Sequence, residues 1–259
     1  MKVVTGPLTL QVDGIGHLSL EGKKLKPDVR TLEQMKPVLL FDDVASVMPS
    51  ETPMYYMYRG VALKNDEPLF AKSAIRYDLT VIPFVEIGRE HNKTLGHYHA
   101  MHDAKYSFTE VYQVLEGEAH YVLQKRADPK SDKVDKVYWV HAVKGDKVVI
   151  PPNFGHVTIN PTDCPLVMAN LVEKDFKSEY EPYKRLHGAA YYDTEGGLVP
   201  NDDYSELPEA VQMGANEFTT KVSPKLAQDL SEAGLYALYL KSPKLFDFLA
   251  DPGKANFGD

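Results

Sequence analysis

Short apolar runs separated by polar turns dominate the middle of the chain. Between residues 61 and 200 the runs are rich in β-branched and aromatic residues, and Gly, Pro, Asp and Asn separate them. Runs of this length and composition predict β-strands bounded by turns. Many such strands in succession are typical of an antiparallel sandwich or barrel. The runs that support this interpretation span residues 79–85, 110–115, 119–124, 137–140, 147–150 and 166–172.

The N-terminal part of the chain continues the β pattern with one interruption. Residues 1–60 hold short strand-like runs and one short predicted helix. Thr31 is a suitable N-cap, and Gln34 three residues later completes the pattern of a capping box. We therefore expect this helix to begin directly after Thr31.

The C-terminal part of the chain changes to a helical pattern. Ser223 and Ser242 each precede a proline, which is typical of an N-cap followed by the first helical residue. Gly234 is a suitable residue to end the first of these helices. We predict a barrel domain with N-terminal strands over residues 1–200 and a C-terminal extension of two or three short helices over residues 201–259. The apolar face of the extension is expected to pack against the barrel or a partner subunit.

Composition excludes several classes of protein. The chain has 259 residues, 43% of them hydrophobic and 25% charged, as in ordinary globular proteins. A net charge of −8 without a basic stripe argues against nucleic-acid binding. The apolar runs are far too short to span a membrane, and the N-terminus lacks the apolar core of a signal peptide. The single cysteine, Cys164, which we expect to be buried, allows no internal disulfide, so we expect a cytoplasmic protein.

Two histidines near the middle of the chain are the first candidates for chemistry. In a strand, His97 and His99 would share one face, about 7 Å apart along the chain. Neutral imidazole is the commonest ligand for transition metals, so the two rings could bind one ion. Taken alone the pair is a weak signal, because histidines two residues apart also occur by chance.

Two later segments supply a carboxylate and a third imidazole. Glu110 begins a strand-like run that ends at Gly117, and a buried carboxylate there would need a cation or another partner. His156 follows a predicted turn, a buried strand and a Pro-Pro pair. Each has an ordinary alternative, since Glu110 could face water and His156 could be a hydrogen-bonded core residue. The succession of three such segments nevertheless favours one metal site.

In these segments the chain resembles the cupin superfamily. The first cupin motif contains His-x-His and a later glutamate that precedes a glycine by seven positions, as His97, His99, Glu110 and Gly117 do here. The second motif matches at Gly145, Pro151, His156 and Asn160. The resemblance implies an all-β cupin jelly-roll β-barrel with short peripheral helices. It also implies four metal ligands: His97, His99, Glu110 and His156.

The chain departs from the general cupin pattern in three places. The leading glycine of the first motif is absent, and His91 stands at that position. The gap between His99 and Glu110 is longer than usual, and Asp103 falls at the usual spacing, so Asp103 is an alternative ligand to Glu110. Asn153 replaces a glycine of the second motif. We expect the turn to survive, because Asn tolerates a left-handed backbone better than most residues.

The resemblance is sharpest to the cupin-type glucose-6-phosphate isomerases, over roughly residues 8–200. The chain shares their Thr-x-Gly-His-x-His segment, their Glu-Val-Tyr segment and a Pro-Pro segment that leads to a histidine. It departs from them at Asn153, where the family has an aromatic residue, and beyond about residue 205, where it has no counterpart. The matching residues are Tyr55, Thr80, Thr94, Gly96, His97, His99, Glu110, Tyr112 and His156.

This resemblance implies a metal-dependent aldose–ketose isomerase that interconverts glucose-6-phosphate and fructose-6-phosphate in glycolysis and gluconeogenesis. Glu110 would serve as base as well as ligand. Tyr112 shares the inward face of the strand with Glu110, so it could position the sugar or simply pack inside the barrel. The ion would be Fe(II), with Zn, Mn or Ni as alternatives for the same donors, and a homodimer is expected. The residues that would contact the substrate and its phosphate are Tyr55, Thr80, Thr94 and Gly96. Apart from the resemblance, we expect Tyr180 to close the pocket.

Two other functions fit the same ligands. An Fe-dependent cupin dioxygenase would use the four ligands but would need no phosphate pocket. A non-catalytic sugar-phosphate-binding cupin would keep the pocket without turnover. Within the isomerase hypothesis, the sequence leaves open a hydride shift in place of proton transfer by Glu110, and whether mannose-6-phosphate is also a substrate.

Overall fold

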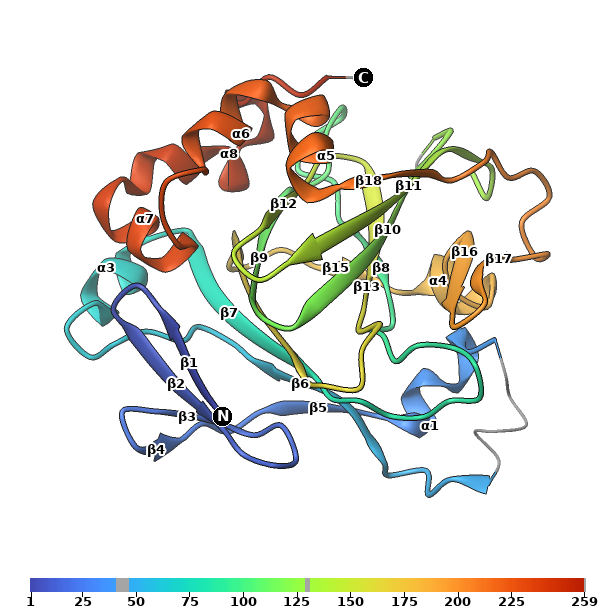
Figure 1. The fold of residues 1–259 in the computed structure, drawn as a ribbon. Helices are drawn as coiled ribbons and strands as arrows, with labels where there is room; N and C mark the ends of the chain where they lie inside the picture. Colours follow the sequence, from blue (N-terminus) through green and yellow to red (C-terminus); the bar gives the residue numbers. More distant parts are fainter. Residues whose placement is uncertain (41–46, 129–130, 259) are drawn as a thin grey trace.

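Two six-stranded sheets form the centre of the molecule in the computed structural model, which describes residues 1–40, 47–128 and 131–258 (Figure 1). Strand pairing within each sheet is antiparallel except between β11 and β18, which run parallel. The first sheet consists, in order, of β15 (Ser178–Glu179), β8 (His97–His99), β13 (Phe154–Ile159), β10 (Glu118–Arg126), β11 (Val134–Val143) and β18 (Val211–Gly214). The second consists of β12 (Lys147–Ile150), β9 (Glu110–Glu116), β14 (Leu166–Glu173), β7 (Ile75–Ile82), β6 (Pro53–Tyr58) and β5 (Asp28–Thr31).

The central strands are buried on both faces and consist largely of apolar residues. Every residue of β13 and of β14 is buried, and so are all residues of β9 except the last. One face of the second sheet looks toward the first sheet, and helices α7 (Leu235–Lys241) and α8 (Asp247–Ala250) contact β14. This explains why the strands read as continuous apolar runs in the sequence. The predicted all-β jelly roll with short peripheral helices is confirmed, in a double-sheet form.

The N-terminal strands form a separate four-stranded sheet of β1 (Lys2–Thr5), β2 (Leu8–Val12), β3 (Leu18–Leu20) and β4 (Lys23–Lys24). After β5, helix α1 (Leu32–Met35) begins at the N-cap Thr31, and Gln34 completes the capping box. This prediction is therefore confirmed. Among its described residues, this half also holds η1 (Lys36–Val38) and α3 (Glu67–Lys72).

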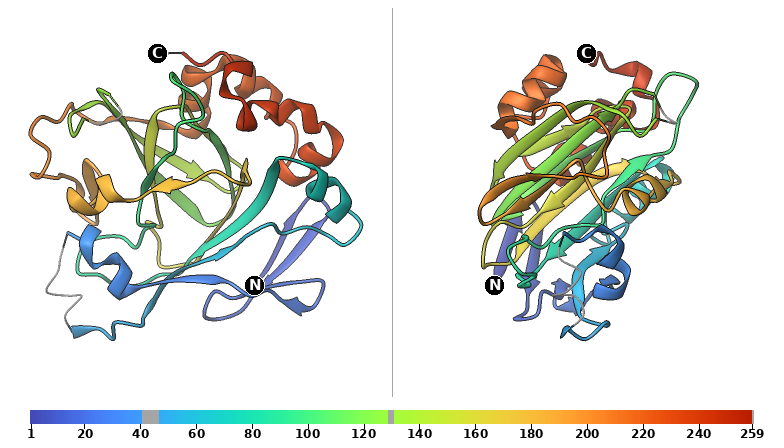
Figure 2. Two further views of the ribbon diagram at one scale, coloured as in Figure 1. Left: turned by 180° about the vertical axis from the view of Figure 1, so that it is seen from behind. Right: turned by 90° about the vertical axis from the view of Figure 1, so that its right-hand side faces the viewer.

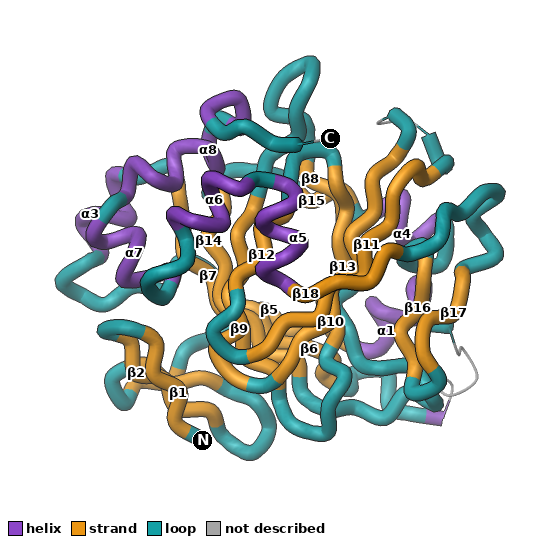
Figure 3. The backbone as a smooth tube through the Cα atoms, turned by 45° about the horizontal axis from the view of Figure 1, so that its top comes forward, coloured by secondary structure: helices purple, strands orange, loops and turns teal. Residues whose placement is uncertain are grey.

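The C-terminal helices gather along one side of the molecule, as Figures 1 and 2 show from three sides, and α7 lies beside the turn between β1 and β2, where a Cβ on Gly6 would be 2.9 Å from Ala237. Figure 3 shows α5 to α8 beside β12 and β14. Before them come α4 (Glu181–Arg185) and a hairpin of β16 (Tyr191–Thr194) and β17 (Gly197–Pro200). The other elements of this part are α5 (Ala215–Val222), α6 (Pro224–Asp229), η2 (Pro243–Phe246) and η3 (Pro252–Lys254).

Predictions for the C-terminal part are confirmed in part. Ser223 caps α6, because its side chain accepts a hydrogen bond from Leu226 N. The prediction that Gly234 ends this helix is wrong. The helix ends at Asp229, and Gly234 is instead the N-cap of α7, with an extended backbone at ψ 146°. The sequence did not predict β18 or α5.

Hydrogen bonds join the C-terminal helices to the sheets. Gln113 Oε1 on β9 accepts from Leu235 N at 2.8 Å, and Thr109 Oγ1 donates to Phe248 O at 3.1 Å.

Cys164 is exposed, so its predicted burial is wrong. Among the helices of the described residues, none is long and apolar enough to cross a membrane.

Candidate metal centre and adjoining pocket

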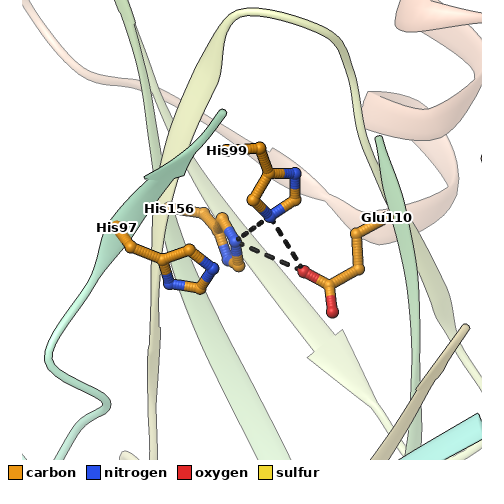
Figure 4. A group of neighbouring side chains, drawn as sticks. All are labelled: His97, His99, Glu110 and His156. Atoms are coloured by element: carbon orange, nitrogen blue, oxygen red, sulfur yellow. Dashed lines mark hydrogen bonds and ion pairs between the residues drawn. The ribbon is translucent and has the colours of Figure 1, made fainter. Parts of the chain in front are cut away.

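The four side chains that the sequence proposed as ligands meet between the two sheets (Figure 4). His97, His99 and His156 lie on β8 and β13 of the first sheet, whereas Glu110 begins β9 of the second. The pairing of β8 with β13 puts His156 opposite His97. One nitrogen or oxygen from each of the four residues lies within 4.8 Å of the others. Residues that are distant in the sequence thus meet at one point, because β8 pairs with β13 in one sheet and β9 belongs to the sheet that faces them.

The atoms at this point lack ordinary hydrogen-bond partners. The Nε2 atoms of His99 and His156 are 3.3 Å apart, and Glu110 Oε2 lies 3.3 and 3.4 Å from them. Within the described part of the chain, no hydrogen bond satisfies the buried His97 Nε2 and Glu110 Oε2. Leaving buried polar atoms unsatisfied costs free energy, and a divalent cation would satisfy all four side chains at once. Three imidazoles and a carboxylate suit a transition-metal ion.

Other groups orient two of the four side chains. His99 Nδ1 lies 2.9 Å from Phe108 O, so the ring donates its Nδ1 proton there and turns the lone pair of Nε2 toward the centre. Asn170 Nδ2 donates to Glu110 Oε1 at 2.6 Å. Partners of this kind hold metal ligands in place and raise metal affinity.

The electrostatics of the centre favour neutral rings. Burial lowers the pKa of His97 and His156 well below the usual value for imidazole. Neighbouring imidazoles lower both pKa values further, and the positive charges of Arg59 and Arg30 add to the effect at His97. A neutral ring keeps the lone pair that a metal needs.

Two special backbone conformations shape the turns beside the ligands. Gly96 has φ +81°, and a Cβ there would lie 2.5 Å from Val157 Cγ2 and 2.7 Å from the Tyr183 ring. Only glycine fits such a position. Asn153 has φ +68°, so the prediction that asparagine preserves the turn before β13 is confirmed.

Asn153 also ties the turn before His156 to the long segment between His99 and Glu110. Its Oδ1 accepts from Ser107 N at 2.9 Å, and its own N donates to Ser107 Oγ at 2.7 Å. Its Nδ2 donates to Lys105 O at 2.9 Å. The two segments therefore hold each other in place.

A pocket adjoins the metal centre, and all residues that the sequence proposed for substrate contact line it. Leu95 N donates to the Tyr55 hydroxyl at 3.4 Å, and Thr94 Oγ1 accepts from Thr158 N at 3.0 Å. The Tyr180 and His97 rings lie 5.4 Å apart. The structure thus brings these residues together, and their roles toward a substrate stay predictions. The lining includes Tyr55, Thr80, Thr94, Gly96, His97, Glu110, Tyr112 and Tyr180.

Tyr112 is a neutral phenol in this pocket. Burial, and next the negative charge of Glu110, raise the pKa of Tyr112 well above the usual value. The hydroxyl therefore keeps its proton around neutral pH. It can donate or accept a hydrogen bond, but it cannot serve as a general base.

Asp103, the alternative ligand, lies outside the metal centre. It is exposed, and its Oδ1 accepts hydrogen bonds from Tyr106 N at 2.8 Å and Lys105 N at 2.7 Å. These bonds lower the pKa of its carboxyl group. Asp103 closes a turn in the segment that leads to β9, so the geometry favours Glu110.

Several residues that line the pocket were not predicted from the sequence. Strand alternation from Thr80 could have indicated Asp78 and Arg76, which share its face of β7. Asn170 stands opposite Tyr112 only through the register of β14 with β9, and the sequence shows no sign of that register. The residues missed include Arg59, Arg76, Asp78, Asn170, Phe176 and Ser178.

A second group of ligand-type residues lies apart from this pocket and is already satisfied. The Asp193 carboxylate on β16 is 2.6 Å from His91 Nδ1 and 2.9 Å from His120 Nδ1, and it accepts from Trp139 Nε1 at 2.5 Å. Burial would raise the pKa of Asp193, but these hydrogen bonds outweigh burial and hold it well below the usual value. We interpret the group as a structural link between β16 and strands β10 and β11.

Two facing, largely antiparallel sheets, with a His-x-His pair, a glutamate and a third histidine between them, define a protein of the cupin class. The family model described as Glucose-6-phosphate isomerase (GPI) matches residues 29–209, well over half of the chain. The chain belongs to the glucose-6-phosphate isomerase family.

Relatives in this family share little sequence identity with this chain, but the matched regions cover most of both proteins. The glucose-6-phosphate isomerase of Thermococcus onnurineus (strain NA1) is 25% identical over 193 residues, which cover 74% of this chain and 92% of that protein. The one from Pyrococcus horikoshii is 27% identical over 175 residues, or 67% of this chain and 82% of that protein. Among solved structures, a cupin 2 conserved barrel domain protein from Rhodopseudomonas palustris superposes with a TM-score of 0.30 at 12% identity, over 48% of this chain and 63% of that one. That superposition is too loose to bear on the site.

Proposed function

We propose that this protein is a metal-dependent aldose–ketose isomerase that interconverts glucose-6-phosphate and fructose-6-phosphate. The observation that carries the proposal is the group of His97, His99, Glu110 and His156 beside a pocket with hydroxyl and amide donors on its walls. Membership of the family supports the reaction. The unsatisfied buried nitrogen and oxygen atoms support the metal.

The reaction moves a carbonyl group between C1 and C2 of the sugar. In our proposal the three histidines and Glu110 hold the ion, which would act as a Lewis acid on the carbonyl and hydroxyl oxygens. Fe(II) is the ion that we propose, on the resemblance to the cupin-type isomerases. Zn, Mn and Ni suit the same donors, so the metal needs a direct test.

Glu110 and Tyr112 are the residues that we propose for catalysis. Glu110 would carry the proton between C1 and C2, and the hydrogen bond from Asn170 fixes the direction of its carboxylate. Tyr112, which keeps its own proton, would orient the sugar by a hydrogen bond. The groups proposed to contact the substrate and its phosphate are the hydroxyls of Tyr55, Thr80, Thr94 and Tyr180 and the backbone N–H of Gly96.

A coupled assay tests the reaction and its metal dependence together. The protein is stripped with a chelator, reloaded separately with Fe(II), Mn, Zn or Ni, and assayed for conversion of fructose-6-phosphate. We expect activity only in reloaded protein. Absence of turnover with every metal would refute the proposal, and oxygen uptake unaffected by sugar phosphates would instead favour a dioxygenase.

The variant Glu110→Gln tests the proton transfer. We expect kcat to fall about 10²- to 10⁴-fold, the range for loss of a general base, and metal content must be measured because the residue is also a proposed ligand. Turnover in D₂O separates the two mechanisms. Transfer by Glu110 exchanges the migrating hydrogen for deuterium, whereas a hydride shift retains it.

We also propose a cytoplasmic homodimer that serves glycolysis and gluconeogenesis, on the resemblance to the family. Light scattering at several protein concentrations measures the oligomeric state. A mass of twice that of the chain, independent of concentration in the working range, is the expected result. A stable monomer would contradict this part of the proposal.

A further inference from the structure

Two arginines and an aspartate form a charged cluster on the wall of the pocket, the Arg59–Asp78–Arg76 cluster. Asp78, only 5% exposed, lies at its centre. Asp78 Oδ2 accepts from Arg76 Nε at 2.7 Å and is 3.7 Å from Arg59 Nη1. Its Oδ1 accepts from Gly60 N at 2.8 Å. The buried carboxylate therefore holds Arg76 by a hydrogen bond and Arg59 by a longer ion pair.

Arg76 is held firmly but keeps donors for a ligand. Besides Asp78, its Nη1 donates to Lys174 O, and its guanidinium carbon lies 5.5 Å from the centre of the Phe176 ring. The side chain is 18% exposed. In the described part of the structure no hydrogen bond engages its Nη2. A guanidinium that is already immobilised loses little conformational entropy when it binds an anion.

Arg59 is the more accessible member of the cluster. Its side chain is 43% exposed, and its Nε is 3.2 Å from the exposed Asp28. Its Nη2 contacts Met57 Sδ at 3.6 Å, and a thioether is a weak acceptor. These weak partners leave the donors of Arg59 available to a stronger acceptor.

The charge and position of the cluster suit a phosphate. The guanidinium groups of Arg59 and Arg76 share one buried carboxylate, and the second carboxylate beside Arg59, Asp28, is 68% exposed, so it offsets the positive charge of this wall only weakly. Guanidinium forks match phosphate oxygens in pairs. Asp78 is two residues from Thr80 on the same face of β7, about 7 Å along the strand. Met57 pairs with Thr80 across β6 and β7, and Arg59 follows Met57 by two residues. A group bound near Thr80 is thus within reach of an arginine side chain.

We propose that Arg59 and Arg76 are specificity-determining residues that bind the phosphate group of the sugar substrate. This inference rests on the proposed function and deepens it, because it names the substrate feature that this wall selects. The hydroxyl and amide donors of Thr80, Thr94 and Gly96 offer only dipoles. The arginines add charge-assisted hydrogen bonds, which are roughly twice as strong as neutral ones. A sugar without phosphate would leave both guanidinium groups unused.

Arg59→Gln gives the cleanest test, because the side chain is accessible and its removal buries no unpaired group. We expect the KM for fructose-6-phosphate to rise about 10- to 100-fold, the equivalent of losing a charge-assisted hydrogen bond, with a smaller change in kcat. Bound metal and Tm should match the parent protein. Arg59→Lys, which keeps the charge but not the fork, should fall between the two.

Binding of inorganic phosphate, measured by calorimetry, gives a readout that needs no turnover. The dissociation constant should rise by a similar factor in Arg59→Gln. The matched control is Arg185→Gln, because Arg185 also pairs with a carboxylate, Asp132, but on the exposed surface. It should leave both KM and phosphate affinity unchanged.

The outcomes separate this inference from the proposed function. An active parent protein with unchanged KM and phosphate affinity in Arg59→Gln would overturn the inference alone. Phosphate binding that depends on Arg59 in a protein without isomerase activity would overturn the proposed function but keep the anion site. A KM increase that follows a loss of bound metal would assign the effect to damage at the metal centre and would also overturn the inference.

Discussion

At the scale of single residues, the metal centre depends on groups that touch the proposed ligands. The Phe108 carbonyl and the Asn170 amide each hold one ligand by a hydrogen bond. The Glu110 carboxylate is buried, so without Asn170 its Oε1 would lose its partner. Residues of this kind should change metal affinity without contact to the ion.

Replacing Asn170 with alanine should weaken metal binding. Loss of the donor frees the Glu110 carboxylate to rotate, and changes of this type typically lower metal affinity about 10- to 100-fold. Competition with a chelator of known affinity measures the change. Asn216→Ala, at an exposed position of α5, should have no effect. Equal affinity in the two variants would contradict the role of Asn170.

Replacing Gly96 with alanine should destabilise the protein more than replacing Gly60. Both glycines have positive φ, at +81° and +62°, so both alanines carry backbone strain of about 1–2 kcal/mol. Only at Gly96 does the new Cβ meet neighbours, at 2.5 and 2.7 Å, and overpacking adds about 1–3 kcal/mol. Urea unfolding of both variants measures the difference. If the two variants unfold alike, the close contact at Gly96 has no energetic consequence.

Site residues were predicted correctly from the sequence where their spacing along the chain identifies them. The intervals around His97, Glu110 and His156 identified a group that the structure brings together. Arg59 and Asn170 were missed because their place in the pocket depends on strand register. The burial predicted for Cys164 was wrong, because the side chain is exposed in the loop before β14.

At the scale of elements, the hairpin of β16 and β17 is joined to the first sheet by one carboxylate. Asp193 accepts hydrogen bonds from His120 on β10 and Trp139 on β11. Its contribution should therefore depend on the carboxylate being charged.

Replacing Asp193 with asparagine should lower stability by about 2 kcal/mol at neutral pH, because hydrogen bonds to a charged group are lost. The pKa of Asp193 is depressed in the folded protein. The unfolded chain therefore takes up the proton first, and the advantage of the parent is complete above the unfolded pKa, about 3.9, and shrinks as the pH falls below it. Urea unfolding at pH 7 and at several acidic pH values checks this.

The matched control for Asp193 is Asp203→Asn. Asp203 also pairs with a histidine, His187, but both side chains are largely exposed. Such pairs contribute little, so we expect a change below about 1 kcal/mol. A difference between parent and Asp193→Asn that grows on acidification would be the wrong sign for this account.

Several strands were predicted correctly, but elements whose formation or ends depend on contacts with distant parts of the chain were not. The apolar runs located β9, β10, β12 and β14, because each of these strands contains adjacent apolar residues that include valine. β18 was not predicted, since its pairing with β11 requires a parallel neighbour far away in sequence. Gly234 was misassigned because glycine suits both ends of a helix, and the local sequence does not decide between them.

At the scale of the whole molecule, we propose that residues 201–259 are an extension that completes the core rather than a unit that folds by itself. Their largest buried side chains include Phe218, Tyr236 and Phe246. The Tyr236 hydroxyl accepts from Leu63 N at 2.9 Å and lies 2.9 Å from Asp66 Oδ2. The extension therefore covers apolar surface that a shorter chain would expose.

A chain that ends at residue 209 should fail to fold. It loses α5 to η3, and each large apolar side chain that it no longer buries represents about 1.5–3 kcal/mol, against a total stability of about 5–15 kcal/mol. Circular dichroism and urea unfolding of purified material measure this. A chain that ends at residue 256 keeps every helix and should fold. Cooperative unfolding of the shorter chain would show that the barrel is complete without the extension.

The hydrogen bonds of Asn153 to Ser107 and Lys105 have a consequence for how the site could have changed over time. Two insertions or deletions that would be independent in most loops are coupled here, since the segment before Glu110 and the turn before His156 share the same three bonds. Shortening the first segment would pull Ser107 and Lys105 away from Asn153, and replacing Asn153 would release the segment. A change in either segment therefore needs a matching change in the other if Glu110 and His156 are to keep their positions.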